Sequence, residues 1–483
     1  MNSPVVWIVF PAITAIALFF VQRRQTVVTV IGTTVALLLG LLALIAPFGE
    51  SVDLGPVSFE LQMSLDVFGR RFLLDSSDRF TLVIIYVGVA FWFAGSLVAQ
   101  AHRLFVPLGL AIATLLTSAL AVEPFLYAAL LIELMVLVSI PMLSPPGNRV
   151  GRGVLRYLTF QTFGFPLILF TGWLLSGVEA GIADAEILRF AFILLAFGFV
   201  FLLGIFPFHT WIPMLSRESH PYVVAFLFFE LPLAITLFAL GFLFRYEWLR
   251  YNPDVYALFA LVGGMMIFIG GGIAAFQRTL GGLLGYTVMV EIGLSLLAVS
   301  LGLGPDGNGT SLGLFFALLL PRAISLGVWA LSLIVISKAR LVETQHDTPP
   351  PQWELSFKEM QGAARQYPIA AFCLLLAQFS LAGLPLLAGF PIRLALWDRL
   401  AQVSFLMTMV VLLGYGGLMI GGIRTMAVLV TGPEDVDWKI HEHWGERLLL
   451  IVGGVVIILM GLFPQAITPT LVRMADVFYQ IVP

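Results

Sequence analysis

Long apolar runs separated by short polar turns make up most of the 483-residue chain. An uninterrupted apolar stretch of about 18 or more residues predicts a helix that can cross a lipid bilayer. The pattern predicts about fourteen such helices, so we expect an all-α polytopic membrane protein. The predicted spans are 5–22, 27–47, 80–99, 103–121, 124–143, 154–176, 186–206, 222–244, 255–276, 283–303, 312–337, 366–402, 404–430 and 447–465.

Two places in this pattern predict broken helices. The run 366–402 is too long for one simple helix, and Pro385 and Pro391 interrupt it near 383–393. Proline removes a helical hydrogen bond and clashes with the preceding turn. The other break lies at 207–221, a polar segment between two apolar runs. Interrupted helices in two separate halves are typical of transporters built from inverted repeats, here of five helices each.

The breaks and loops divide the chain into four parts. In the first of them (1–100), the segment from Val57 to Asp66 partly alternates apolar and polar residues, which predicts a short hairpin or strand. The parts are N-terminal helices with an external hairpin-like segment (1–100), a first half (101–280), a second half (281–430), and a C-terminal helix with a tail (431–483).

The basic residues of the loops predict the orientation, because cytoplasmic loops carry an excess of Lys and Arg. With the predicted spans, all basic loops fall on one face, and the acidic loop around Glu179, Asp184 and Glu186 falls on the other. Both termini then lie on the non-cytoplasmic side. We expect the bacterial inner membrane, with an organelle membrane as the alternative. The basic loop residues are Arg23, Arg24, Arg103, Arg149, Arg152, Arg156, Lys338, Arg340, Lys358 and Arg365.

Composition supports the membrane assignment. Hydrophobic residues make up 60% of the chain and charged residues 11%, whereas about a quarter is usual in soluble domains. A net charge of -3 gives no reason to expect nucleic acid as a partner. The single cysteine, Cys373, excludes an internal disulfide or a thiolate metal cluster. The first apolar run lacks a basic n-region and a cleavage site, so we expect it to be a retained helix.

Ionisable side chains inside spans are costly and usually functional. Glu133 and Glu230 lie within predicted spans, and both are candidates for carrying protons. The alternative for Glu133 is a neutral acid bonded to a neighbouring helix. The alternative for Glu230 is a role in local backbone strain, because Pro232 frees a carbonyl one turn earlier.

Glu291 also lies inside a span and is a candidate for carrying protons. The alternative role for Glu291 is a buried ion pair with Arg322 or Arg393. Arginine stays protonated, so it can shift the pKa of a neighbouring acid but cannot itself relay a proton. His209 and His220 bracket the break, where they either shuttle protons or lie solvated at the interface. The candidate proton-path residues are therefore Glu133, His209, His220, Glu230, Glu291, Arg322 and Arg393.

Several motifs resemble one known family. The heptapeptide 207–213 (Pro-Phe-His-Thr-Trp-Ile-Pro) is the most specific. With the segments listed below, it resembles the antiporter-like membrane subunits of complex I (NADH:quinone oxidoreductase), the Mrp cation/proton antiporters and the membrane-bound hydrogenases. The M-type (chain 4-like) subunits look most similar. The other matching segments are Met63 to Gly69, Leu131 to Leu134, Leu155 to Tyr157, Leu283 to Tyr286, Glu291 to Gly293 and Ala382 to Arg393.

The resemblance implies a hydrated axis of a glutamate and buried lysines at mid-membrane, with Glu133 as the fifth-helix glutamate. This chain departs from that pattern. The family's lysines would fall near Ala234 and at Gly281, and Arg393 stands where the last lysine or glutamate would be. The chain has only three lysines, Lys338, Lys358 and Lys439, and the predicted spans place all of them in loops.

Two functions are consistent with these residues. The first is a proton-translocating subunit of a complex-I-like NAD(P)H or ferredoxin:quinone oxidoreductase, in which acids and histidines replace the lysines. The second is a non-conducting scaffold that anchors a peripheral or catalytic partner, or an Mrp-type antiporter subunit. The chain shows no enzymatic site of its own, so quinone, flavin and iron–sulfur clusters are expected only in partner subunits. We expect other membrane subunits and the lipid bilayer as partners, a peripheral partner at loop 338–365, and no nucleic acid.

Overall fold

Apolar helices make up most of the structure, which confirms the membrane-protein prediction. Within the described part of the chain, eleven helices are long and apolar enough to cross a membrane, and three shorter apolar helices accompany them. This agrees with the expected number of spans. The computed structural model describes residues 2–46, 48, 51–54, 57–60, 62–67, 69–147, 149–176, 185–303, 310–343, 353–432, 440–466 and 468–472.

The chain folds into two compact units. The first comprises Met1–Val150, Val154–Phe208 and Glu230–Arg245, and the second comprises Gly151–Gly153, His209–Phe229 and Tyr246–Pro483. One long helix, α9 (Pro221–Arg245), contributes its beginning to the second unit and its remainder to the first.

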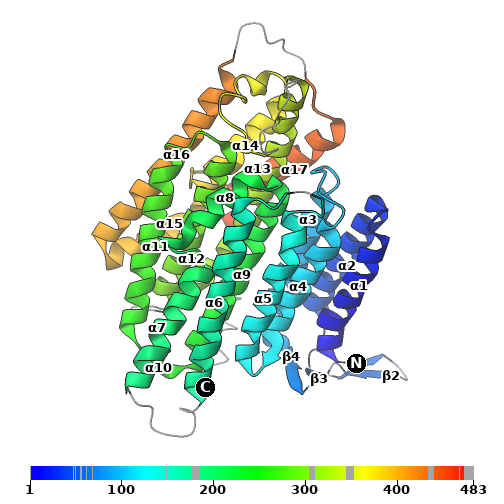
Figure 1. Ribbon diagram of the computed structural model, residues 1–483, viewed down its shortest axis with the longest axis vertical. Helices are drawn as coiled ribbons and strands as arrows, with labels where there is room; N and C mark the ends of the chain where they lie inside the picture. The colour runs from blue at the N-terminus through cyan, green and yellow to red at the C-terminus, as the bar shows by residue number, and fades with distance from the viewer. Residues whose placement is uncertain are drawn as a thin grey trace. The chain divides into compact units, whose positions relative to one another are not determined.

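The helices of the first unit follow one another along the chain, with a segment of short strands between α2 and α3 (Figure 1). Besides the second part of α9, they are α1 (Phe10–Val21, preceded by a π-helical turn at Val5–Val9), α2 (Gln25–Ile45), α3 (Arg79–Gly95), α4 (Phe105–Ala121), α5 (Ala128–Leu143), α6 (Arg152–Ser176) and α7 (Ala185–Leu202).

Five short strands belong to the same unit. β1 (Ser51–Leu54) pairs antiparallel with β2 (Val57–Glu60), and β3 (Ser64–Val67) pairs with β4 (Arg70–Leu73), which also pairs with β5 (Val122–Glu123). The segment predicted as one hairpin or strand is thus divided between two strands of different sheets.

Hydrogen bonds fix which helix ends lie together in this unit. The Ser3 hydroxyl donates to the Leu74 carbonyl at 2.8 Å, so the start of α1 lies near the start of α3. The Thr29 and Ser96 hydroxyls lie 3.3 Å apart, which brings the start of α2 to the end of α3. Successive helices are therefore antiparallel, and α4 begins at the end of the unit where α1 finishes.

The helices of the second unit surround α12 (Leu280–Leu303), nearly all of whose side chains are buried. α12 contacts α8 (Trp211–Glu218), α11 (Pro253–Ala274), α13 (Thr310–Glu343), α15 (Phe390–Val403) and α16 (Phe405–Val430). The remaining helices are α10 (Glu247–Arg250), α14 (Pro368–Leu381) and α17 (Trp444–Leu462).

The chain leaves helical geometry near both predicted breaks. A short 3-10 helix (Phe208–Thr210) precedes α8, and only two residues separate the end of α8 from the start of α9. Most of the polar segment 207–221 is therefore itself helical. In the second unit, α14 ends at Leu381 and α15 begins at Phe390, with Gly383 in the left-handed region at a φ of 78°.

The predicted loop 338–365 was wrong at its beginning. α13 continues to Glu343, so Lys338 lies in a membrane-length helix, where it forms an ion pair with Glu446 of α17. The apolar run before Lys338 keeps the helix going, and the carboxylate partner makes the charge tolerable there. Several predicted features lie outside the described residues: Glu179, Asp184, the prolines at 349–351, Lys439 and the side chain of Arg340.

Candidate functional site

Glu291 of α12 lies between two arginines in the second unit. Arg322 of α13 donates from Nε to Glu291 Oε2 at 2.8 Å and from Nη2 to the Glu291 carbonyl at 2.9 Å. Arg393 of α15 donates from Nη2 to Glu291 Oε1. All three side chains are buried, with Glu291 only 2% exposed. We call these three residues the Glu291 cluster.

The Glu291 cluster carries a net positive charge, because one carboxylate faces two guanidinium groups. Arginine stays protonated in proteins, so this excess charge does not depend on pH. The ring of Tyr415 from α16 lies 5.9 Å from the Arg393 guanidinium carbon, at a distance where the π-face attracts a cation. The cluster is therefore a fixed buried charge, with the carboxylate held by ion pairs.

A buried polar network links α12, α13 and α14 beside this cluster. The Trp329 indole donates to Gln378 Oε1 at 3.0 Å, and Gln378 Nε2 donates to the Thr287 hydroxyl at 3.5 Å. The hydroxyls of Ser325 and Ser380 lie 2.9 Å apart.

Helical spacing explains why this network lies next to the Glu291 cluster. Thr287 is four residues before Glu291 on α12, and residues four apart share one helix face. On α13, Ser325 and Trp329 follow Arg322 by three and seven residues, so all three also share a face. The second unit thus contains a continuous buried layer of polar side chains.

The segment before α9 packs closely on the start of α12. The Ser216 hydroxyl of α8 donates to the Gly281 carbonyl at 2.6 Å, and Arg217 donates to Gln277 at 2.7 Å. A Cβ atom at Gly281 would lie 2.5 Å from the Ser216 carbonyl oxygen, and one at Gly285 would lie 2.5 Å from the Pro213 Cα. Only glycine permits this approach without a backbone shift.

Both candidate histidines lie in the second unit. His209, which is buried, has its ring centre 6.3 Å from that of Tyr286, five residues before Glu291 on α12. His220 connects α8 and α9, and its ring packs edge-on against Trp353 with centres 4.5 Å apart. His220 is partly buried. Proton transfer and a solvated position at the interface both stay predictions for His220.

Glu133 and Glu230 belong to the first unit. Glu133 lies on α5, where its carboxylate accepts a hydrogen bond from the Thr162 hydroxyl of α6 at 2.8 Å. Glu230 lies on α9, is completely buried, and has no hydrogen-bond partner for either carboxylate oxygen within the described part of the chain. The structure therefore groups Glu291, Arg322 and Arg393 in one site, and it places Glu133 and Glu230 in different surroundings.

The chain is similar in sequence to one known family of membrane proteins. Residues 162–429, more than half of the chain, match the model of the NADH:quinone oxidoreductase/Mrp antiporter transmembrane family. The chain belongs to this family. The matched range includes the Glu291 cluster and the buried polar network, whereas α1 to α5 precede it.

Curated relatives of the same family include two NADH-quinone oxidoreductase N subunits. Subunit N of Cupriavidus taiwanensis is 28% identical over 327 residues, covering 66% of this chain and 63% of the relative. Subunit N 2 of Solidesulfovibrio magneticus is 26% identical over 372 residues, covering 70% of this chain and 71% of the relative. The chain thus spans less than two thirds of the length of the first of these relatives.

Solved structures show the same fold over nearly the whole chain. The Mrp complex from Dietzia sp. DQ12-45-1b superposes with a TM-score of 0.79 at 16% identity, covering 99% of this chain and 97% of that one. Respiratory complex I from Thermus thermophilus with bound NADH gives 0.72 at 20% identity, covering 99% and 100%. Both are multi-subunit membrane complexes.

The close packing of α8 on α12 bears on a lysine position that was expected from the resemblance alone. By resemblance, the family's lysine falls at Gly281, where even a Cβ atom would meet the Ser216 carbonyl. The second such position, Ala234 on α9, is 1% exposed. This chain therefore has no room for a long basic side chain at position 281 unless α8 moves.

Reasoning from the sequence missed the buried polar network, because that search covered only ionisable side chains. Gln378 interrupts an apolar run, and a buried amide needs hydrogen-bond partners. This signal could have identified Gln378 as a site residue. Its partners Thr287 and Trp329 lie 91 and 49 residues away, and no local pattern indicates them.

Proposed function

We propose that this chain is a proton-translocating, antiporter-like integral membrane subunit of a redox-driven complex of the complex I type. The redox reaction, NAD(P)H or ferredoxin:quinone oxidoreduction, would take place in partner subunits that hold the flavin, iron–sulfur and quinone groups. The single observation that carries this proposal is the environment of Glu230.

Glu230 is a buried carboxyl group that the surrounding packing does not explain. A polar group removed from water costs free energy unless it gains hydrogen bonds, and an ionised one costs much more. The alternative role, relieving backbone strain near Pro232, would require a bond to the backbone. Neither oxygen makes such a bond in the described structure, and α9 remains helical through Pro232. A group that takes up and releases a proton accounts for this cost.

Glu133 supports the same proposal. It lies in the middle of α5, and one of its oxygens has a single neutral partner, Thr162, while the other has none in the described structure. A hydroxyl donor satisfies a carboxylate without fixing its charge as an arginine would. This environment agrees with a role for Glu133 as the fifth-helix glutamate that the resemblance implies.

The Glu291 cluster favours a second candidate function. Two arginines from different helices bind this carboxylate, so ion pairing alone can account for the acid. A non-conducting scaffold that anchors a peripheral or catalytic partner through its cytoplasmic loops would keep such a cluster for stability alone. An Mrp-type antiporter subunit is the corresponding alternative for the parent complex.

The proposal also includes the broken helices, the orientation and the membrane that were predicted from the sequence. The interruptions before α9 and between α14 and α15 would be the broken helices of two inverted repeats. Both termini would face away from the cytoplasm, in a bacterial inner membrane. The assignment to M-type subunits stays a prediction, since the two curated relatives described above are N subunits.

Proton flux into sealed vesicles that contain the purified parent complex tests the proposal. We expect Glu230→Gln and Glu133→Gln to assemble normally and to lower flux more than about tenfold, the usual effect of removing a proton-transfer group. Asp398→Asn, which changes an exposed acid on α15, is the matched control and should keep full flux. Unchanged flux in both glutamine variants would support the scaffold function instead.

A further inference from the structure

An apolar groove lies on the first unit, outside the region that matches the family model. Side chains of α1 and α4 alone line it, and its volume is about 320 Å³. The small residues Ala12, Ala15 and Ala111 leave this space, and Phe20 beside it is 79% exposed. Thr114 is the polar lining residue, and its hydroxyl is already bonded to the Leu110 carbonyl at 2.8 Å. We call this surface the α1/α4 groove.

The α1/α4 groove has the length of one leaflet. Its lining runs from residue 107 to residue 115 along α4, which is about 12 Å at 1.5 Å per residue. Half of a bilayer's hydrocarbon core is about 15 Å thick. The groove therefore fits an extended acyl chain lying parallel to the helices.

Basic residues gather at one end of the groove. Arg23 and Arg24 follow α1 by two and three residues, and Arg103 precedes α4 by two. The antiparallel order of the helices puts these turns at the same end of the unit, together with the turn after α5 that holds Arg149. All four arginines are exposed, and the segments 22–25, 96–104 and 144–150 contain no acidic residue. We call this the basic end.

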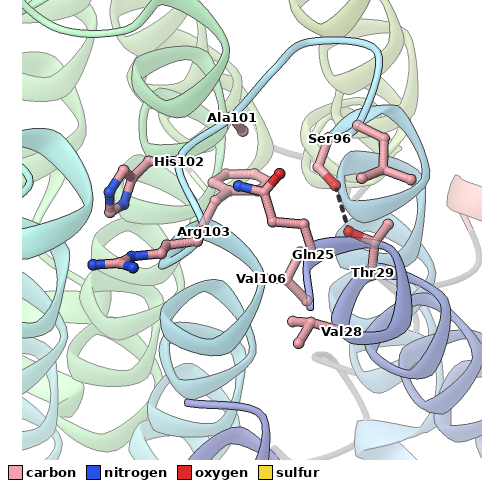
Figure 2. A pocket seen from close by; sticks show the side chains of 10 residues that line it. Gln25, Val28, Thr29, Ser96, Ala101, His102, Arg103 and Val106 are labelled. Carbon is pink, nitrogen blue, oxygen red and sulfur yellow. Dashed lines mark hydrogen bonds between the residues drawn. The ribbon is translucent and has the colours of Figure 1, made fainter. Parts of the chain in front are cut away.

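Figure 2 shows the loop between α3 and α4 at the basic end. The imidazole of His102 and the guanidinium of Arg103 extend side by side from this loop, beside a small hollow that Gln25 and the Thr29–Ser96 pair also line. His102 Nδ1 accepts a hydrogen bond from the Leu104 amide at 3.3 Å, so that nitrogen carries no proton. Burial and the adjacent Arg103 also lower the pKa of His102 below its usual 6.5. At neutral pH, the arginines thus supply the charge.

We infer that the α1/α4 groove is a binding site for an anionic phospholipid. The acyl chain lies in the groove, and the phosphate lies at the basic end against Arg103, Arg23 and Arg24. An exposed apolar groove matches a hydrocarbon chain, and a cluster of arginines without acids matches an anionic headgroup rather than a zwitterionic one.

Lipid retention by the full chain, purified in detergent with its associated subunits, tests this inference. The sample is exchanged into phosphatidylglycerol or phosphatidylcholine with identical acyl chains, and bound lipid is counted by native mass spectrometry. Wild type should retain phosphatidylglycerol preferentially. Arg103→Gln should reduce that retention by about fivefold, the loss expected for one basic residue near an anionic headgroup.

Two variants and one competitor separate the parts of the site. Arg149→Gln removes an exposed arginine at the same end, in the turn between α5 and α6, and should change retention less than twofold because neither helix lines the groove. Ala111→Phe fills the groove and should lower retention of both lipids. Inorganic phosphate should not displace the lipid, because it has no acyl chain. Equal retention of the two lipids by wild type, equal effects of the two arginine variants, or full displacement by phosphate would each overturn the inference.

Discussion

Glu291 and Glu230 show how differently two buried acids can be treated in one chain. Glu291 receives hydrogen bonds from two arginines on different helices, whereas Glu230 receives none from the described residues. An acid paired in this way contributes to structure, because removing it would leave two buried positive charges without a partner. Burying an acid without hydrogen-bond partners lowers the stability of the fold. The proton-carrying role proposed above would account for keeping Glu230 in such a place.

Glu291→Gln should therefore destabilise the second unit strongly. Breaking a buried ion pair by removing one partner costs about 3–5 kcal/mol. We expect a large drop in the thermal unfolding midpoint in detergent, or loss of folded protein on size exclusion. Ser295→Ala is the control, because it removes a buried neutral hydrogen bond to the Glu291 carbonyl and should cost about 1 kcal/mol. Equal midpoints for wild type and Glu291→Gln would contradict a structural role for the cluster.

Glu442 gives the chain a pH-dependent stability outside the spans. Its Oε1 accepts a hydrogen bond from the Ala370 amide at the start of α14, at 2.8 Å. Burial raises the pKa of Glu442 above its usual 4.5, and the amide bonds partly oppose this effect. The folded protein thus holds this proton more tightly than the unfolded one. Its stabilising contribution is complete below pH 4.5 and is lost as the pH rises through the raised pKa.

Glu442→Gln keeps an oxygen for the Ala370 amide but removes the titration. Unfolding midpoints measured from pH 4 upward should fall less steeply for this variant than for wild type. Asp398→Asn, the exposed acid of α15, should follow the wild-type curve. Parallel curves for wild type and Glu442→Gln would show that Glu442 does not cause the dependence.

The sequence could predict single residues where a charge interrupts an apolar run. Glu291, Arg322 and Arg393 were all recognisable in this way, and pairing between them was one expected alternative. That both arginines bind the same carboxylate could not be predicted, since their positions 31 and 102 residues away depend on how three helices pack. Ser325 and Ser380 were missed because lone serines in apolar helices usually bond to their own backbone.

At the scale of elements, the close contact between α8 and α12 depends on two glycines one turn apart. Gly281→Ala should destabilise the second unit, because its Cβ would meet the Ser216 carbonyl and overpacking typically costs about 1–3 kcal/mol. Gly272→Ala on α11 is the matched control. A Cβ there meets nothing within 4 Å, and alanine favours a helix over glycine by up to about 1 kcal/mol.

Thermal unfolding of the two glycine variants distinguishes packing from helix propensity. We expect a lower midpoint for Gly281→Ala and an equal or higher midpoint for Gly272→Ala. If both variants gain stability, α8 is able to move away from α12 at little cost. The close approach would then not explain why position 281 holds a glycine.

Hydropathy predicted the existence of the helices better than their ends. The structure has two helices in the run 366–402, with Pro385 in the connection between them and Pro391 in the first turn of α15. The end of α13 was predicted at residue 337, yet the helix continues to Glu343. Lys338 looked like a loop residue because its partner Glu446 is 108 residues away and cannot be found from local sequence.

At the scale of the whole molecule, the orientation in the membrane can be tested with the single native cysteine as background. Cys373 is buried and should react little with a membrane-impermeant maleimide. We expect Arg24→Cys and Arg149→Cys to be labelled only from the cytoplasmic face in oriented vesicles. Met63→Cys, exposed next to β3 at the opposite end of the first unit, should be labelled only from the other face. Labelling in the reverse sense would contradict the predicted orientation of the first unit.

The tight contact of α8 on α12 also limits how such a chain can change during evolution. A lysine at position 281 needs space that the Ser216 carbonyl now fills, so the substitution is harmful until α8 has shifted. A shift of α8 brings no benefit while position 281 holds a glycine. The residue at position 281 and the placement of α8 are therefore coupled, so that a change in either one needs a compensating change in the other.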